Sequence, residues 1–389
     1  MRRRTFLRRG ALALGAPAVL ARQVETEGWG PDPARGLASA RATRARSSQP
    51  GASVLLNSNE NPLGIPPVSR SAILEGLEEA NRYPGASRRA LTRALAEKHG
   101  AETDSVVLGN GSTEILQMGV QCRMDPDLTL VTPTPTYEDV FEYCDPHPWI
   151  DVHAIPLTRE YAHDLGTMEE AALAAEGPVL VYVCNPNNPT GSLTSVDVVE
   201  GWIGRAPANV HFLVDEAYFE FVDDGSYRSL VPLARENPNV VVARTFSKVY
   251  GMAGLRLGYA IAHPETARWL RGFAAGPNAN HLALVAGRAA LEDPGWVRRS
   301  VEANLRARRM AYQVLDELDL EYIPSHTNFV MHRVRGDLRE YIQRMRDAGI
   351  RVGRPFPPML EWNRLSFGLP GEMERFADTL RDFRRRGWV

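Results

Sequence analysis

The feature that most constrains the fold is a series of short apolar runs rich in β-branched residues, with helical patterns between most of them. Residues 179–184 and 240–244 are typical of strands buried on both faces, and residues 113–123 are typical of a helix. Strands that alternate with helices predict an α/β fold with a mostly parallel sheet covered on both faces. Further strands are predicted at residues 105–108, 128–132, 210–215 and 257–262.

Five of the predicted strands run directly into polar motifs at their C-terminal ends. The motifs begin at Gly109, Thr132, Asn185, Asp215 and Thr245. Ligands of open α/β sheets bind at this edge of the sheet. One such motif would be weak evidence, but five together predict a single site.

A long helical pattern at residues 294–318 ends this part of the chain. Two strands are predicted after it, at residues 328–332 and 364–367, with a helix at 338–348 between them and a last helix from Glu372. This mixture predicts a smaller α+β domain that follows the large α/β domain.

Lys248 stands out because the chain uses arginine almost everywhere else. Among the 45 lysines and arginines, only Lys98 and Lys248 are lysines. Arginine stays protonated, whereas a lysine can lose its proton and attack a carbonyl carbon. Lys248 is therefore predicted to form a Schiff base with pyridoxal 5'-phosphate (PLP) and to act as the base that moves a proton during catalysis.

PLP chemistry also needs a carboxylate that keeps the pyridine nitrogen protonated, so that the ring accepts electrons. Asp215 is the candidate for this role, because it ends a strand expected to lie near that of Lys248. Tyr218 and Asn188 are candidates for hydrogen bonds to the phenolic oxygen of PLP. The structural alternatives are a helix-capping aspartate, a half-buried tyrosine and a tight turn.

The phosphate of PLP needs an anchor. Gly111, Ser112 and Thr113 open a predicted helix, whose first backbone N–H groups would face an anion. Ser247 and Arg256 would add a hydroxyl and a forked guanidinium. A plain helix cap is the alternative for the first three residues.

Arg364 is the candidate for binding the α-carboxylate of the substrate. The strand period places Arg364 and Ser366 on one face and Leu365 and Phe367 on the other, so that the apolar pair faces the small domain. A structural salt bridge is the alternative for Arg364. Tyr137, in a proline-rich loop, is a candidate for stacking on the PLP ring.

The N-terminus has the features of an export signal. Arg3 and Arg4 fit a twin-arginine motif, and a short apolar run ends in a plausible cleavage site, so residues 1–21 are predicted to be a signal peptide. Residues 22–50 lack hydrophobic periodicity and are predicted to be a flexible linker. The expected location is periplasmic or otherwise outside the cytoplasm, without stable membrane insertion after cleavage. A basic tail on a cytoplasmic protein is the alternative.

Composition argues against several other classes of function. The formal net charge of −2 gives no general attraction to nucleic acid. Cys122, Cys144 and Cys184 are an odd number without metal-like spacing, so no metal site is predicted, and they are interpreted as separate thiols. An oxidising compartment would allow one disulfide.

The blocks Asn188-Pro-Thr-Gly, Asp215-Glu-Ala-Tyr and Ser247-Lys-x-x-Gly-x-Ala-Gly-Leu-Arg together resemble the fold-type I, class I and II PLP-dependent aminotransferases, and within them the histidinol-phosphate aminotransferase group. The resemblance runs from residue 55 to the C-terminus. It implies an N-terminal arm at 51–70, a large PLP-binding domain at 71–293 with an α/β/α sandwich, and a small domain at 294–389.

The resemblance also implies an obligate homodimer with shared active sites. In this group a tyrosine reaches the PLP phosphate of the partner subunit, and Tyr83 matches it within Asn81-Arg-Tyr-Pro. The substrate pocket is expected to involve Asn59, Tyr137 and Arg354 in addition to Arg364.

The amino donor is the point on which this chain departs from the group. The group carries an arginine for the substrate phosphate shortly after a Gly-Ile pair, and Arg354 is displaced from that place by one position. Histidine biosynthesis is also cytoplasmic, which fits poorly with an export signal. We therefore expect ping-pong transamination of another amino acid or amine, with a 2-oxo acid such as 2-oxoglutarate as acceptor. The alternatives are histidinol-phosphate transamination itself and PLP-dependent decarboxylation or elimination.

Overall fold

The computed structural model describes residues 53–389. The predicted signal peptide and linker lie outside these residues, as do the first two residues of the predicted arm. Within residues 53–389, no helix is long and apolar enough to cross a membrane.

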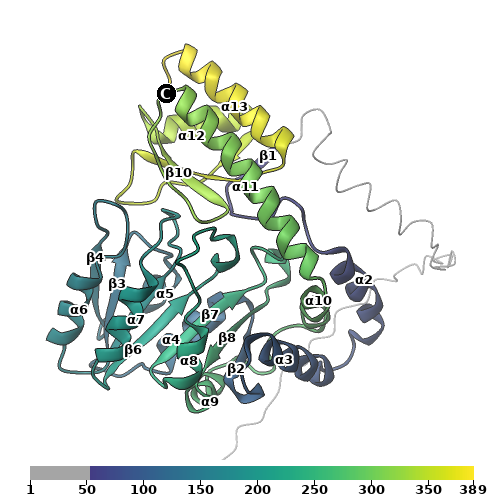
Figure 1. The fold of residues 1–389 in the computed structure, drawn as a ribbon, viewed down its shortest axis with the longest axis vertical. Coiled ribbons are helices and arrows are strands. Elements are labelled where there is room, and N and C mark those ends of the chain that lie inside the picture. Colours follow the sequence, from purple (N-terminus) through teal and green to yellow (C-terminus); the bar gives the residue numbers. More distant parts are fainter. Residues whose placement is uncertain (1–52) are drawn as a thin grey trace, which may run out of the picture. The chain divides into compact units, whose positions relative to one another are not determined.

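The core of the large part of the molecule is a seven-stranded sheet in the order β2-β8-β7-β6-β5-β3-β4 (Figure 1). All its neighbouring strands pair in parallel except those that pair with β8, so the predicted, mostly parallel sheet is confirmed. The strands are β2 Val106–Gly109, β3 Thr129–Thr134, β4 Asp151–Pro156, β5 Val179–Cys184, β6 Val210–Asp215, β7 Val240–Thr245 and β8 Gly258–Ala262.

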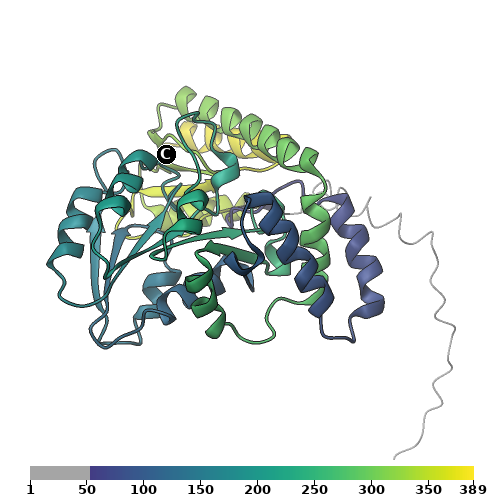
Figure 2. The same ribbon diagram turned by 60° about the horizontal axis from the view of Figure 1, so that its bottom comes forward.

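Helices cover both faces of this sheet (Figures 1 and 2). Alternate residues of a central strand enter different hydrophobic clusters: Phe212 and Val214 face one cluster, and Leu213 faces the other. This period of two is expected for a strand buried on both faces. On the Phe212 side lie α3 Gly85–His99, α6 Leu165–Ala174, α7 Val196–Arg205, α8 Val231–Glu236 and α10 His281–Leu291; on the Leu213 side lie α4 Gly111–Gln121, α5 Asp139–Cys144 and α9 Pro264–Gly272.

A second region, after α10, has its own apolar cluster around Phe376 and Leu365. An antiparallel sheet in the order β12-β10-β9 lies in this region. The helices and strands of the second region, in chain order, are α11 Pro294–Glu317, β9 Tyr322–Ile323, β10 Phe329–Arg333, α12 Leu338–Asp347, β11 Ile350–Val352, β12 Trp362–Ser366 and α13 Pro370–Arg385.

The beginning of the described chain joins this second region. Strand β1, Val54–Leu56, pairs in parallel with β11, and Leu56 is buried in the same apolar cluster. After β1 the chain turns back toward the large sheet and forms α2, Pro67–Gly76, which packs against α10. The arm therefore connects the two regions, which the sequence pattern did not predict.

Two further differences from the predicted elements have local causes. The sequence pattern missed β4, because this edge strand exposes much of its surface and needs no apolar run. The strand predicted from residue 105 begins at Val106, because Thr103–Ser105 forms a 3₁₀ turn. The other short 3₁₀ turns are Leu77–Glu79, Phe219–Phe221 and Ala253–Leu255.

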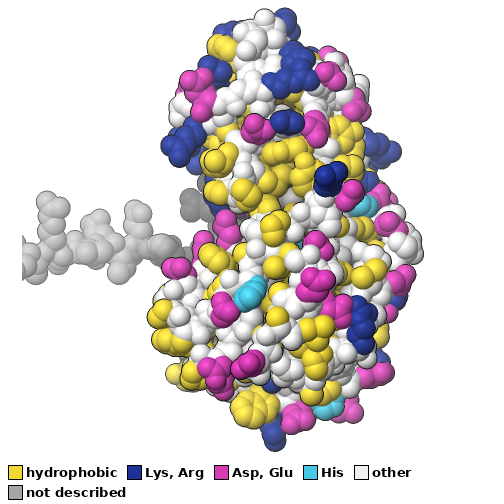
Figure 3. Space-filling model, turned by 90° about the vertical axis from the view of Figure 1, so that its left-hand side faces the viewer, with side chains coloured by type: hydrophobic (Ala, Val, Ile, Leu, Met, Phe, Trp, Pro, Cys, Tyr) yellow, Lys and Arg dark blue, Asp and Glu magenta, His cyan; other side chains and the backbone are white. Residues whose placement is uncertain are grey.

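The surface carries charges of both signs. Figure 3 shows one face, on which acidic and basic side chains are interspersed with apolar ones. This agrees with the small formal net charge of the chain. Cys122, Cys144 and Cys184 are all free thiols in the structure, in agreement with their interpretation as separate thiols.

Candidate active site

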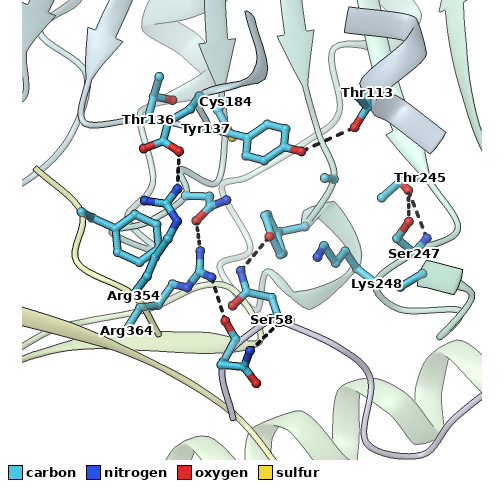
Figure 4. A pocket seen from close by; sticks show the side chains of 18 of the residues that line it. Ser58, Thr113, Thr136, Tyr137, Cys184, Thr245, Ser247, Lys248, Arg354 and Arg364 are labelled. Carbon is cyan, nitrogen blue, oxygen red and sulfur yellow. Dashed lines mark hydrogen bonds and ion pairs between the residues drawn. The ribbon is translucent and has the colours of Figure 1, made fainter. Parts of the chain in front are cut away.

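The C-terminal ends of the central strands open into a cavity of about 650 Å³ that the second region also lines (Figure 4). The strand-end motifs predicted to form a single site meet here. All of the predicted site residues line the cavity except Gly111 and Tyr83. Gly111 lies directly beside it, next to Ser112, whereas Tyr83 is 89% exposed on the surface.

Lys248 follows β7 and points into the cavity (Figure 4). Its Nζ lies 5.6 Å from the centre of the Tyr218 ring. Desolvation, followed by the nearby positive charge of Arg364, lowers the pKa of Lys248 to about 8. A larger fraction of neutral amine is therefore present near neutral pH, as a nucleophile and a base require.

Asp215 is the last residue of β6, and its side chain is almost completely buried. Its Oδ1 accepts a hydrogen bond from the N–H of Ala217 at 3.0 Å, and its Oδ2 accepts one from the hydroxyl of Tyr182 at 3.2 Å. Burial is the main cause that raises the pKa of Asp215 to about 6. The predicted neighbourhood of the Asp215 and Lys248 strands is confirmed, because β6 pairs with β7.

Tyr182 was missed by the sequence reasoning. It lies within the apolar run of β5 and is completely buried. Because its hydroxyl donates to Asp215, it fixes the carboxylate from the neighbouring strand. The only sequence signal was a phenol in a buried strand, which needs a polar partner.

The hydroxyl of Tyr218 is held by the N-terminal arm. Asn59 Nδ2 donates to Tyr218 Oη at 3.0 Å, and Ser366 Oγ donates to Asn59 Oδ1 at 3.0 Å. Asn59 has a φ of 53°, a left-handed conformation that asparagine tolerates better than most residues. Asn59 of the arm therefore lies between Tyr218 and Ser366 of β12.

Arg364 enters the cavity from β12, on the side opposite Lys248 (Figure 4). Its Nη1 donates to Asn188 Oδ1 at 2.6 Å, and its Nη2 donates to the carbonyl of Asn57 at 3.1 Å. Its Nε is buried without a hydrogen-bond partner, and within residues 53–389 no carboxylate forms an ion pair with it. Desolvation lowers the pKa of Arg364 to about 10. The structural salt bridge that was the alternative for Arg364 is therefore not formed within residues 53–389.

The predicted face of β12 is confirmed. Arg364 and Ser366 face the cavity and the arm, whereas Leu365 and Phe367 enter the apolar cluster of the second region. Arg364 also lies 4.5 Å from the centre of the Phe356 ring. This stacking fixes the plane of the guanidinium.

The start of α4 forms a narrow cradle. A Cβ atom on Gly111 would lie 2.4 Å from Arg256 Nη2, so only glycine lets this guanidinium lie across the helix terminus. A Cβ on Gly258 would lie 2.3 Å from the backbone nitrogen of Ser112. The close approach leaves the first N–H groups of α4 beside an arginine, which is a suitable arrangement for a phosphate.

Hydroxyls of Thr113, Thr245 and Ser247 line the same cavity. Thr245 Oγ1 donates to Ser247 Oγ at 3.0 Å, and the N–H of Ser247 donates back to Thr245 Oγ1. Thr113 Oγ1 lies 3.5 Å from Tyr137 Oη, which donates to Asp139 at 2.7 Å. Thr245 was not among the predicted site residues, although it begins the motif that contains Lys248.

The outer part of the cavity carries one ion pair. Arg354 contacts Glu138, which follows Tyr137, and stacks over Phe356 at 4.3 Å. Arg354 comes from the loop between β11 and β12, whereas Glu138 belongs to the large sheet region. Arg354, which the sequence analysis predicted to contact the substrate, is therefore already paired with the carboxylate of Glu138.

These residues fit PLP by their chemistry. An amine with a lowered pKa, a buried carboxylate, and a glycine-lined helix terminus beside Arg256 provide what its aldehyde, pyridine nitrogen and phosphate each require. When bound, PLP supplies an electron sink for the carbon that carries the amino group. The orphaned Nε of Arg364 leaves one further donor for an anionic group of the substrate.

Comparison with known proteins agrees with this site. The family model described as aminotransferase class I and II matches residues 52–380. The chain belongs to this family. It is a PLP-dependent transaminase with the fold-type I architecture, and it transfers an amino group to a 2-oxo acid.

The relatives share most of their length with this chain. Histidinol-phosphate aminotransferase 1 of Cupriavidus pinatubonensis is 37% identical over 333 residues, which cover 84% of this chain and 87% of the relative. Histidinol-phosphate aminotransferase of Moorella thermoacetica is 35% identical over 332 residues, which cover 85% of each. The structure of histidinol-phosphate aminotransferase from Sinorhizobium meliloti in complex with PLP matches with a TM-score of 0.81 and 26% identity, covering 89% of this chain and 94% of that chain.

Proposed function

We propose that the chain transfers the amino group of a donor that carries a carboxylate or phosphate group close to the amine-bearing carbon, with histidinol phosphate as the first candidate donor. The names of the relatives favour histidinol phosphate over the other amino donors expected from the sequence. The proposal rests on one observation: Arg364 presents a buried positive charge to the cavity.

The surroundings of Arg364 support an anionic ligand. A buried guanidinium without a carboxylate partner is costly, and an anion that accepts hydrogen bonds offsets this cost. Both carboxylate and phosphate accept paired hydrogen bonds from arginine. Since Arg364 faces Lys248 across the cavity, an anionic group of the donor on Arg364 would direct its amine-bearing carbon toward Lys248 (Figure 4).

Arg364→Gln is expected to lower kcat/KM for the donor by on the order of 100-fold or more, because one partner of a buried charged pair is removed. The visible absorbance band of the bound cofactor should remain, since the substituted side chain lies at the substrate end of the cavity. The measurement is steady-state kinetics with histidinol phosphate and a panel of amino acids, each with 2-oxoglutarate.

The matched control is Arg333→Gln, on the adjacent strand β10, where the arginine pairs with surface glutamates. Its kcat/KM should stay within about threefold of the wild type. Unchanged kinetics in Arg364→Gln would contradict the assignment of Arg364. Turnover of an amino acid but not of histidinol phosphate would replace the donor and leave the role of Arg364 intact.

Decarboxylation or elimination on the same scaffold is the second candidate from the sequence. The cofactor-binding residues do not distinguish it from transamination, because they contact PLP and not the leaving group. The same reactions can be assayed for carbon dioxide and ammonia. Release of either product, without conversion of the 2-oxo acid to an amino acid, would favour the second candidate.

We further propose that the enzyme is a homodimer whose interface includes the segment from Leu63 to Tyr83. Leu74 and Leu77 are 57% and 52% exposed in the single chain, and Tyr83 is 89% exposed. Exposed apolar side chains gathered in one segment are typical of a surface that another chain covers. An interface here would bring Tyr83 to the partner's site, as the resemblance implies.

Leu74→Glu combined with Leu77→Glu is expected to convert the dimer to a monomer, because two charges would be buried without partners. Transamination should fall with dimer content, since the site would lack Tyr83 from the other subunit. Sedimentation analysis measures the mass. Leu173→Glu, on α6, is the control for an equally exposed leucine and should leave the mass unchanged. A wild-type monomer with full activity would contradict the proposal.

A further inference from the structure

We infer that the buried ion pair between Arg244 and Glu216 is a positioning device that holds the strand end of Asp215 at a fixed distance from the strand end that leads to Lys248. Neither residue lines the cavity. The inference does not depend on which amino donor the enzyme uses.

The position of the pair in the sheet carries the first part of the argument. The β6–β7 ladder ends with Asp215 opposite Ala243, and the N–H of Glu216 donates to the carbonyl of Ala243 at 3.0 Å. Glu216 and Arg244 are the next residues along these two strands. The ion pair therefore joins β6 and β7 immediately beyond the last ladder position, which is the position that carries Asp215.

The direction of the side chains separates the pair from the cavity. Along β6, Phe212 and Val214 face one side of the sheet and Leu213 faces the other. With a period of two, Asp215 shares the side of Leu213, and Glu216 shares the side of Phe212. The carboxylates of Asp215, which ends β6, and of Glu216, which follows it, therefore lie on opposite faces of the sheet: Asp215 in the cavity and Glu216 on the other side.

The pair is buried and fully hydrogen-bonded. Arg244 and Glu216 side chains are only 4% and 1% exposed, and Arg244 Nε donates to Glu216 Oε2 at 2.8 Å. Glu216 also accepts from Ser229 Oγ and from the N–H of Leu230, both at 2.7 Å. Arg244 donates to Glu220 at 3.2 Å and stacks over the ring of Phe219 at 3.9 Å. No other arginine–carboxylate pair within residues 53–389 is so completely buried.

A stabilising role alone does not explain such a pair. Apolar residues of similar volume often make a core equally stable or more stable than a buried ion pair does. An arginine fork, however, fixes distance and angle, whereas apolar contacts allow sliding. A rigid ring that must contact Asp215 at one end and Lys248 at the other needs strand ends that do not slide. The pair supplies this constraint from the dry face of the sheet.

The test combines the substitutions Glu216→Gln and Arg244→Met. Gln keeps an acceptor for the N–H of Leu230, and Met fills part of the arginine volume, so the charges of Arg244 and Glu216 leave together. Glu220, which also pairs with Arg244, is changed to Gln in the same variant so that no carboxylate is left without its arginine. We expect the PLP-free protein to unfold within a few degrees of the wild type. Its dissociation constant for PLP should rise about tenfold, which corresponds to about 1.4 kcal/mol of binding free energy.

A second readout follows the strand end directly. Hydrogen exchange of the backbone amide at position 216 in the PLP-free protein should accelerate in the combined variant, because the ladder loses its terminal constraint. With saturating PLP, kcat should fall by roughly 100-fold, as expected for a small displacement of reacting groups. If the pair were merely structural, the combined variant would unfold at a lower temperature, and its PLP affinity and its kcat at saturating PLP would stay at the wild-type values.

The control is Arg308→Met with Asp223→Asn, which removes a less buried ion pair outside the β6–β7 ladder. It should leave PLP affinity unchanged. Wild-type PLP affinity and amide exchange in a folded Glu216→Gln, Glu220→Gln, Arg244→Met variant would overturn the inference. If that variant does not fold, Arg244→Lys keeps the charge and loses the fork; it should weaken PLP binding about threefold, and wild-type affinity would equally overturn the inference.

Discussion

Lys248→Ala will lower transamination by about 10⁴-fold, because it removes both the nucleophile that holds the cofactor and the base that moves the proton. The lowered pKa of Lys248 and its position in the cavity are the reasons for assigning both roles to one residue. The measurements are single-turnover kinetics with excess PLP and the absorbance spectrum of the purified protein. The visible band that depends on the covalent bond should be absent.

Lys98→Ala is the matched control, since it is the only other lysine in the chain. Lys98 Nζ lies 3.4 Å from the hydroxyl of Tyr250, outside the cavity, so its loss should leave the rate and the spectrum nearly unchanged. Wild-type turnover in Lys248→Ala would remove the central assumption of the catalytic assignment.

Asp215→Asn will have two opposite effects. With PLP, kcat should fall by roughly 10³-fold, because the pyridine nitrogen loses the carboxylate that keeps it protonated. Without PLP, the variant should be more stable than the wild type at pH 8. Burial raises the pKa of Asp215 to about 6, from an ordinary value of 3.8, so the ionised form is disfavoured in the folded protein.

The sign of the pH dependence follows from this raised pKa. The folded PLP-free protein binds the Asp215 proton more tightly than the unfolded chain does, so its stability rises as the pH falls from about 6 to about 4. Above pH 6 the full cost is present, at most about 3 kcal/mol for a shift of this size. Asn carries no charge and has no such cost.

Denaturant unfolding of both PLP-free proteins at pH 8 and pH 4 measures this difference. The advantage of Asp215→Asn should be present at pH 8 and should disappear at pH 4. Asp125→Asn, at an aspartate away from the cavity, is the control and should show no such difference. Equal stability of the wild type and Asp215→Asn at pH 8 would mean that burial does not strain Asp215.

The central part of the site could be predicted because it follows from local patterns. Strand periodicity located the ends of β6 and β7, and parallel strands bring such ends to one edge of the sheet. The sequence alone therefore predicted that Asp215 and Lys248 belong to one site. The scarcity of lysine indicated the role of Lys248, and the strand period of residues 364–367 predicted the face on which Arg364 lies.

The supporting contacts could not be predicted in this way. Asn59 reaches Tyr218 only because the arm crosses to β12, and no spacing in the sequence encodes this crossing. Tyr182 and Arg244 lie in runs that resemble ordinary buried strands, so their polar partners appear only when neighbouring strands are aligned. The neutralisation of Arg354 by Glu138 likewise depends on how two separate loops approach each other.

The crossing of the arm also limits when this enzyme can be completed during its synthesis. Asn59 and Ser366, which hydrogen-bond to each other, are 307 residues apart in the chain. The large sheet has all its strands once residue 262 has left the ribosome, but β1 has no partner until β11, Ile350–Val352, has followed. Contacts between such distant residues form late because a long loop must close first. A chain that stops before β12 therefore contains Lys248 and Asp215 but lacks Ser366, through which Asn59 is held at Tyr218, so the complete site requires β12.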